Sequence, residues 1–179
     1  SALPPSSAAV APSRSTEKAD KEARGRQVGS EMDVGFRTLH LEKRFPLAIS
    51  RGTITGSDNL FVSVTENGMT GWGEMAPGAT EGADSAEAGE RALRAFVSDG
   101  LDPCSIHATW AKAWAVGVAP CAMAALDMAL WDLRAKQADL PMHRMLGLGR
   151  RAVTTSLTVG INPPEVVRER VPLLLAQGA

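Results

Sequence analysis

Aromatic residues are scarce in this sequence: tyrosine is absent, and aromatic residues make up 4% of the 179 positions. Aliphatic side chains and methionine must therefore fill most of any core, and the 44% apolar content is sufficient for one. Long apolar runs are missing too, since no stretch approaches the roughly 20 apolar residues that a helix needs to span a bilayer. We therefore expect a soluble protein with an aliphatic core.

The sequence also lacks an excess of either charge, since the formal net charge is -1. Lysine and arginine are dispersed along the chain and form no cluster. Binding to nucleic acid or to a membrane surface normally needs a basic face, so neither partner is expected. Cys104 and Cys121 form no disulfide framework, which fits a reducing, cytoplasmic compartment. A zinc site that combined them with His107 and His143 would lack the usual ligand spacing, so ordinary structural roles are favoured.

Residues 1–31 contain mainly serine, alanine, proline and charged residues, without apolar periodicity. Such a segment buries too little surface to offset its ordering entropy, so we expect a disordered N-terminal extension. It has no apolar h-region and is not an intact signal peptide. Met32 could be the biological start after a tag or a misread frame, and a processed leader is the other possibility.

A β-rich region follows. A first strand-like run begins near Val34 and ends in a charged turn at Glu42–Arg44, and a second covers Asn59–Thr65. Asn67–Gly68 then predicts a two-residue hairpin, because both central positions of a type I′ turn need positive φ. The chain resumes at Met69–Glu74. Three antiparallel strands in a meander are the simplest interpretation.

Helical patterns come next. Asp84 or Ser85 can cap a first helix, a second stretch follows, and the strongest pattern runs over Ala119–Gln137. In the strongest one, Asp132 and Lys136 form an i,i+4 pair. Its apolar residues recur on one face: Met123, Leu126, Leu130 and Leu133.

The last part of the sequence predicts one strand over Val153–Ile161, a turn, and a helix over Glu165–Ala176. One such β-α unit cannot cover its own sheet edges, since parallel strands need neighbours on both sides. We therefore expect the unit to belong to a larger structure.

Gly71–Pro77 has the pattern G-x-G-E-x-x-P, and Ala124–Leu133 is followed by a Leu-Pro and a Leu-Gly pair. These motifs resemble a strand-end segment and the cap-helix signature of the muconate lactonizing enzyme subgroup of the enolase superfamily. Pro46–Thr53 and Thr158–Ile161 resemble the dipeptide epimerases, such as the L-Ala-D/L-Glu epimerase, in particular. The resemblance covers about residues 32–179 and identifies an N-terminal fragment of such an enzyme.

This resemblance implies an α+β capping domain over residues 32–149, with a three-stranded antiparallel meander plus helices. Residues 150–179 would then be the first β-α unit of an incomplete TIM-type barrel. The family removes a proton α to a carboxylate, with Mg²⁺ stabilising the enediolate and a lysine or histidine as base. These groups lie on later barrel strands, so we expect no catalytic residue and no metal ligand in this chain. The fragment alone would be inactive, and the parent would be a homo-oligomer.

The resemblance also indicates substrate contacts in two cap loops. The first loop lies within Arg44–Thr53, where Arg51 would reach a substrate carboxylate, since guanidinium binds one bidentately. The second is Gly78–Asp84, with Thr80 and Glu81 as polar groups and small residues that fit a mobile lid. A solvated hairpin arginine and a plain surface loop are the alternatives. Related epimerases often carry a tyrosine in the second loop, and this chain has none.

Thr158, at the end of the first barrel strand, matches a substrate-contacting position of the dipeptide epimerases, although strand threonines are often simply packed. Glu74 is placed at a strand end in the cap, which favours a structural role. Trp110 and Trp114 are expected in the core or between cap and barrel. The three histidines have no partners in sequence and are not expected to act as bases or metal ligands: His40, His107 and His143.

The sequence analysis therefore identifies the substrate-specificity cap of a Mg²⁺-dependent epimerase or racemase, an isomerase. The preferred substrate is a dipeptide such as L-Ala-L/D-Glu. A muconate-type cycloisomerase, an o-succinylbenzoate synthase and an N-acylamino acid racemase are alternatives in the same superfamily. A non-catalytic binding module, a cap that has lost its barrel, is the alternative of another class.

Overall fold

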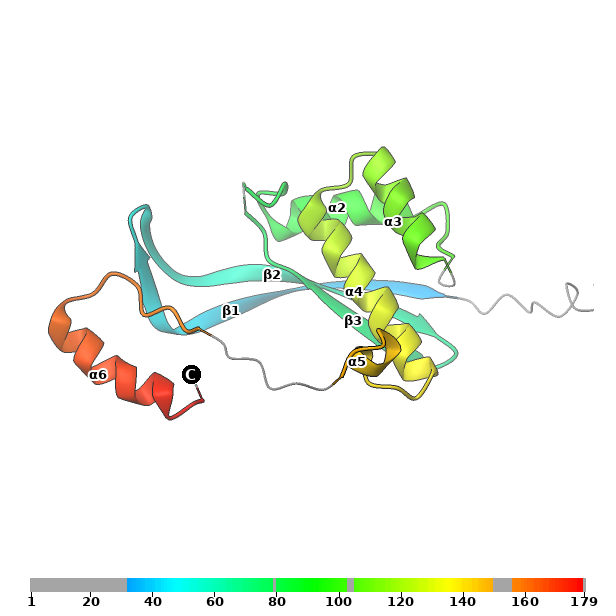
Figure 1. The fold of residues 1–179 in the computed structure, drawn as a ribbon. Helices are drawn as coiled ribbons and strands as arrows, with labels where there is room; N and C mark the ends of the chain where they lie inside the picture. The colour runs from blue at the N-terminus through cyan, green and yellow to red at the C-terminus, as the bar shows by residue number, and fades with distance from the viewer. Residues whose placement is uncertain (1–31, 79, 103–104, 150–155, 179) are drawn as a thin grey trace, which may run out of the picture. The chain divides into compact units, whose positions relative to one another are not determined.

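The computed structural model describes residues 32–78, 80–102, 105–149 and 156–178 (Figure 1). The predicted N-terminal extension, Cys104 and the start of the predicted barrel strand lie outside these residues. The elements are β1 (Asp33–Ile49), β2 (Gly52–Glu66), β3 (Met69–Met75), α2 (Ala86–Val97), α3 (Ile106–Ala115), α4 (Pro120–Gln137), α5 (Met142–Met145) and α6 (Pro164–Leu175).

The three strands form an antiparallel sheet in the order β1-β2-β3, which confirms the predicted meander. Asn67 and Gly68 have φ values of 52° and 76°, as the hairpin between β2 and β3 requires. Leu60 pairs with Thr38 on β1 and with Met75 on β3, so β3 ends level with the middle of β2.

The prediction that the first strand ends at Glu42–Arg44 was wrong. β1 continues to Ile49, and its pairing with β2 shifts between Glu42 and Leu47, where β1 carries extra residues. Such a bulge bends the pair and accommodates a proline, which has no N–H for the ladder. Residues 39–59 therefore project beyond β3 as a two-stranded arm with its turn at Ser50–Arg51 (Figure 1). We call residues 39–59 the arm.

The helices α2 and α4 pack on one face of the sheet, and α3 packs against α4 (Figure 1). Ser85 caps α2 as predicted, because its hydroxyl accepts a hydrogen bond from the Ala88 amide at 3.2 Å. The predicted apolar face of α4 is confirmed as core. It packs with alternate residues of β2, which a strand directs to a single face: Leu60, Val62, Val64, Met123, Leu126, Leu130 and Leu133.

Two glycines of β3 let the backbone of α4 lie directly against the sheet. A Cβ atom on Gly73 would overlap the Ala125 carbonyl oxygen and stand 2.8 Å from its carbonyl carbon. A Cβ on Gly71 would stand 2.5 Å from the Leu133 nitrogen. Ala129, fully buried on the same helix, carries only a methyl side chain. The G-x-G motif is therefore a packing motif, in which the missing side chains bring strand and helix into contact.

Polar contacts fix the register of α4 along the edge of β3. The Trp72 amide donates to the Asp132 carboxylate at 2.9 Å, and the Lys136 ammonium donates to the Thr70 carbonyl at 2.8 Å. The predicted Asp132–Lys136 ion pair is confirmed at 2.6 Å. Because both ends of this pair also bind β3 backbone, it joins helix to strand in addition to stabilising the helix.

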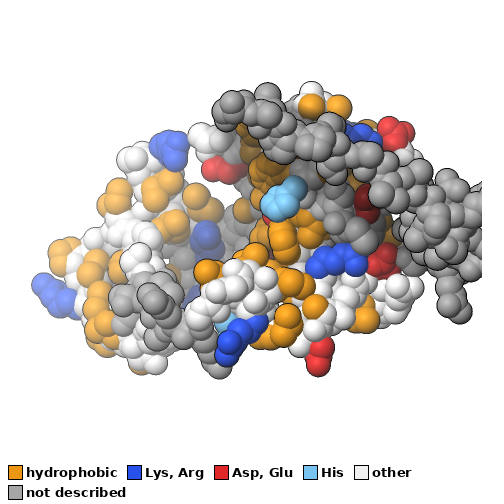
Figure 2. Space-filling view, turned by 45° about the vertical axis from the view of Figure 1, so that its right-hand side comes forward, with side chains coloured by type: hydrophobic (Ala, Val, Ile, Leu, Met, Phe, Trp, Pro, Cys, Tyr) orange, Lys and Arg blue, Asp and Glu red, His pale blue; other side chains and the backbone are white. Residues whose placement is uncertain are grey.

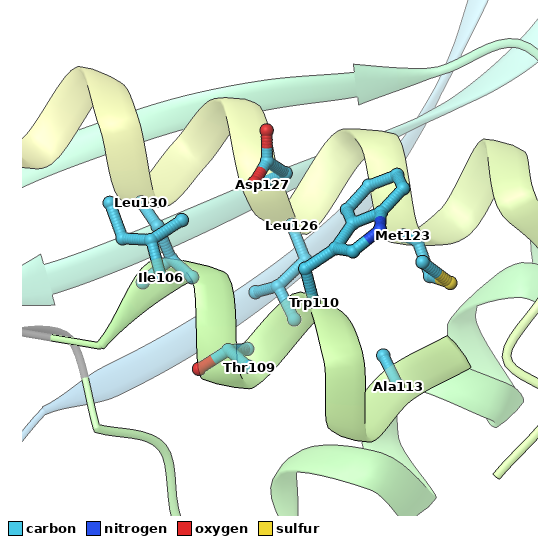
Figure 3. A pocket seen from close by; sticks show the side chains of 8 residues that line it. All are labelled: Ile106, Thr109, Trp110, Ala113, Met123, Leu126, Asp127 and Leu130. Atoms are coloured by element: carbon cyan, nitrogen blue, oxygen red, sulfur yellow. The ribbon is translucent and has the colours of Figure 1, made fainter. Parts of the chain in front are cut away.

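α3 packs against α4 along a narrow cleft (Figure 3). The cleft has a volume of about 10 Å³, enough for one water molecule at most. Half-buried Asp127 lies on its wall, where burial raises the pKa of its carboxyl while nearby His107 opposes the rise. Trp110 also lines the cleft but is 40% exposed, and Trp114 is 65% exposed, so neither is a core residue.

The predicted barrel strand is not observed in the described residues. Residues 156–161 have no regular secondary structure, whereas the predicted helix is present as α6. A parallel strand depends on hydrogen bonds to neighbouring strands. Here the Ile161 amide instead donates to the Ala48 carbonyl in the arm at 2.8 Å.

Replacing Gly73 by alanine is expected to lower the free energy of unfolding by about 3 kcal/mol, at the upper end of overpacking, because the new Cβ meets helix backbone that cannot rotate away. Chemical denaturation measures the loss. Gly149→Ala is the matched control, since nothing lies within 4 Å of its added Cβ, and should change stability by less than about 0.5 kcal/mol. Equal stability of the two variants would contradict the close helix–strand contact.

Asp127→Asn is expected to raise the free energy of unfolding at pH 7, because the ionised carboxylate is partly desolvated in the folded protein. The folded pKa is raised, so the wild-type protein recovers this stability as pH falls through the folded pKa towards the unfolded value of about 3.9. The advantage of the variant should therefore shrink over that range. Urea unfolding across the pH series checks this, with exposed Asp99→Asn as control. A constant advantage at every pH would contradict the burial effect.

Candidate functional site

The arm carries the first predicted substrate contact at its tip. Ile49 pairs with Gly52, so Ser50 and Arg51 form the turn between β1 and β2. Arg51 is exposed there. The predicted loop Arg44–Thr53 is thus mostly paired strand, so Arg51 lies at the turn of a hairpin and not on an irregular loop.

The second predicted contact loop, residues 78–84, is closed on itself. The Gly78 amide donates to the Ala83 carbonyl at 2.8 Å, and the Glu81 amide donates to the Gly78 carbonyl at 3.0 Å. The loop is also tied to the start of α4, because the Cys121 amide donates to the Glu81 carbonyl at 3.2 Å. Thr80 and the Glu81 side chain are exposed.

Sheet topology brings these two segments to one end of the cap. β1 and β3 are each antiparallel to β2, so they run in the same direction and their C-terminal ends lie at the same end of the sheet. The arm and the loop at 78–84 both leave the sheet there (Figure 1). The predicted pairing of two cap loops as one site is therefore compatible with the topology.

Thr158, the third predicted contact, lies beside the arm. It lines a hollow of about 240 Å³ between the bulge of β1 and the C-terminal segment. The lining is mainly apolar with two cationic side chains, and is made by Lys43, Phe45, Pro46, Leu47, Thr158, Val159, Arg170 and Leu174. Such a lining suits a ligand that has an apolar part and an anionic group.

Sequence reasoning missed most of this hollow. Lys43 was assigned to a turn, Phe45 lay within the predicted loop Arg44–Thr53, and Arg170 was given no role within the predicted helix. The available signal was Pro46, because a proline within a strand is confined to an edge, a strand start or a bulge. Nothing in the local pattern of α6 could indicate that Arg170 meets this bulge, because the contact spans 124 positions along the chain.

Within the described ranges, no three histidine, cysteine, aspartate or glutamate side chains come together in a way that could hold a metal ion. The residues present therefore do not fit a Mg²⁺ site, and no chemical step through a metal can be assigned to them. In the same part of the chain, no helix is both long and apolar enough to cross a membrane.

Residues 32–147 match the N-terminal domain of the mandelate racemase / muconate lactonizing enzyme family. A curated relative, the hydrophobic dipeptide epimerase of Roseobacter litoralis, is 68% identical over 148 residues, which are 83% of this chain and 43% of the relative. The chain thus spans less than half the length of that relative.

Solved structures agree. A dipeptide epimerase from Methylococcus capsulatus, complexed with Mg and L-Arg-D-Lys, matches with a TM-score of 0.73 and 32% identity, over 82% of this chain and 43% of that one. A dipeptide epimerase from Enterococcus faecalis, complexed with Mg and L-Leu-L-Tyr, matches with a TM-score of 0.72 and 28% identity, over 81% and 42%. The chain therefore belongs to the mandelate racemase / muconate lactonizing enzyme family of the enolase superfamily, and residues 32–147 match its N-terminal domain.

Proposed function

We propose that this chain is the substrate-specificity cap of a dipeptide epimerase that acts on hydrophobic dipeptides. The observation that carries the proposal is the 68% identity to a hydrophobic dipeptide epimerase, which extends over 83% of this chain. Residues 32–149 form the cap in this proposal, and residues 150–179 begin the barrel. The parent protein is then an isomerase, while the cap by itself has no catalytic group.

We propose a hydrophobic dipeptide as the substrate, in place of L-Ala-L/D-Glu, the example that the sequence suggested. Two observations support a hydrophobic dipeptide in its place. The Roseobacter litoralis relative is a hydrophobic dipeptide epimerase, and five of the eight residues lining the hollow beside the arm are apolar: Phe45, Pro46, Leu47, Val159 and Leu174. An apolar wall of this kind selects for an apolar substrate side chain.

The chemistry of the parent is removal of a proton α to a carboxylate and its return to either face. In the parent, barrel residues outside this chain would hold Mg²⁺. The metal would neutralise the charge that develops on the substrate carboxylate. Our proposal assigns binding and orientation to the cap. Arg51 contacts a substrate carboxylate, Thr158 lines the side-chain hollow, and Thr80 with Glu81 close the other side. Holding the substrate in the reactive geometry can by itself contribute a large share of an enzyme's rate enhancement.

A contact surface for the rest of the parent supports this assignment. Large apolar side chains are exposed on α3 and α4, including Trp114 at 65% and Met128 at 44%. Figure 2 shows hydrophobic side chains exposed across the visible face of the molecule. Apolar patches on an isolated unit mark surfaces that another domain or another copy covers, as expected for a cap on a barrel or within a homo-oligomer.

A chimera tests the proposed function. The aligned 148 residues of this chain replace the corresponding part of the Roseobacter litoralis enzyme, and epimerisation of hydrophobic dipeptides is followed by α-proton exchange in deuterated solvent. We expect activity that requires Mg²⁺, whereas the chain alone is inactive. Arg51→Ala in the chimera should raise KM about tenfold or more with a smaller change in kcat, because it removes a charge-assisted contact made in the ground state too.

Two outcomes would contradict the proposal. A folded chimera that is inactive on hydrophobic dipeptides but active on another carboxylate would assign the cap to a different member of the superfamily. A folded chimera inactive on every substrate tested would favour the non-catalytic binding module. Arg37→Ala is the matched control, since Arg37 is an exposed arginine on β1 outside the arm, and it should leave both kinetic constants unchanged.

A further inference from the structure

The arm is the least supported part of the sheet. β3 pairs with β2 only as far as Leu60, whereas β1 and β2 continue to pair as far as Ile49 and Gly52. The arm therefore has two strands where the rest of the sheet has three. An isolated two-stranded ribbon is marginally stable at best, so the position of Arg51 at the tip depends on what the arm contacts.

The C-terminal segment contacts the arm at three consecutive points. Arg170 of α6 places its guanidinium 4.9 Å from the centroid of the Phe45 ring. The same guanidinium donates a long hydrogen bond of 3.5 Å to the Pro46 carbonyl. Three residues before α6 begins, the Ile161 amide donates to the Ala48 carbonyl at 2.8 Å. The contacts cover the bulge and the strand that leads to the tip.

Gly160 shapes this contact. Its φ is +78°, a conformation that side chains rarely adopt, and an added Cβ would stand 2.9 Å from the Ala48 carbonyl oxygen and 3.1 Å from a Leu47 methyl. The segment therefore approaches the arm backbone as closely as a glycine allows. This closeness lets the Ile161 amide reach Ala48, two residues before the turn.

We propose that Arg170 and Gly160 are positioning residues that clamp the arm and so fix where Arg51 stands relative to Thr158. Both residues act on the tip through the arm, Arg170 by way of Phe45 and Gly160 by way of Ala48. The clamp also forms one wall of the hollow, since Arg170, Phe45 and Thr158 all line it. The consequence for substrate selection rests on the proposed function, whereas the clamp itself rests on the contacts alone.

Hydrogen–deuterium exchange of the full 179-residue chain tests the clamp without substrate. Arg170→Ala and Phe45→Leu should each speed exchange of the amides between Leu47 and Gly52 about two- to fivefold, the range for an exposed cation–π contact. The double variant should exchange more slowly than the two single effects combined would predict, because both substitutions remove the contact between Arg170 and Phe45. Phe45→Tyr, which keeps an aromatic ring, should exchange like the wild type.

Gly160→Val provides an independent variant that acts on the backbone contact and should speed exchange of the same amides. Arg168→Ala is the matched control, since it removes an exposed arginine from the same helix. Unchanged exchange in both Arg170→Ala and Gly160→Val would overturn the clamp, and so would additive effects in the double variant. Far-UV circular dichroism of each variant shows whether the helices remain folded.

The link to substrate selection is measured in the chimera. Arg170→Ala should raise KM for hydrophobic dipeptides several-fold while kcat changes less than about twofold, because a misplaced tip weakens binding in ground and transition states alike. Equal losses in both constants, or none, would contradict the specificity role. An inactive chimera would count against the proposed function, and the exchange experiment would then decide the clamp.

Discussion

The contact between α4 and the glycines of β3 is the constraint on which the rest of the structure depends. Gly71 and Gly73 leave no side chain between strand and helix, so the backbone of Ala125 and Ala129 lies against the sheet. Close packing of this kind tolerates no added atoms. The fully buried Leu60, Val62 and Val64 fill the space beside the contact, and the core is complete only at this separation.

The same contact determines where the candidate site lies. With α4 fixed on β3, the start of α4 holds the loop at 78–84 through the bond between Cys121 and Glu81. The arm leaves from the same end of the sheet because β1 and β3 run in the same direction. A rigid core therefore supports two exposed segments, which is how functional loops are commonly positioned. The arm then needs a second support, and the contacts with α6 supply one.

Features that depend on local sequence were predictable. The Asn67–Gly68 hairpin, the Ser85 cap and the apolar face of α4 each follow from residues within one turn or one helix. The glycines of β3 were recognisable as a motif. The reason why glycine is needed there was not, because it involves a helix about fifty residues further along the chain.

The errors came from contacts between distant segments. The charged residues Glu42–Arg44 were interpreted as a turn, because a run of charged residues fits a bulge inside a strand as well as a turn after it. Residues 156–161 have the composition of a strand but no partner strand among the residues that the structure describes, and strand formation depends on partners more than on propensity. The hollow beside the arm combines the bulge of β1 with the C-terminal segment, which are far apart in sequence. No local pattern encodes such a juxtaposition.

Native-state hydrogen exchange under increasing denaturant tests the central contact most directly. Amides of β3 and α4 are predicted to exchange only through global unfolding, with one common free energy of opening, while amides of the arm open at a lower free energy. If α4 instead opened well before β3, or the arm were as protected as β3, the contact across Gly71 and Gly73 would not be the one on which the fold depends.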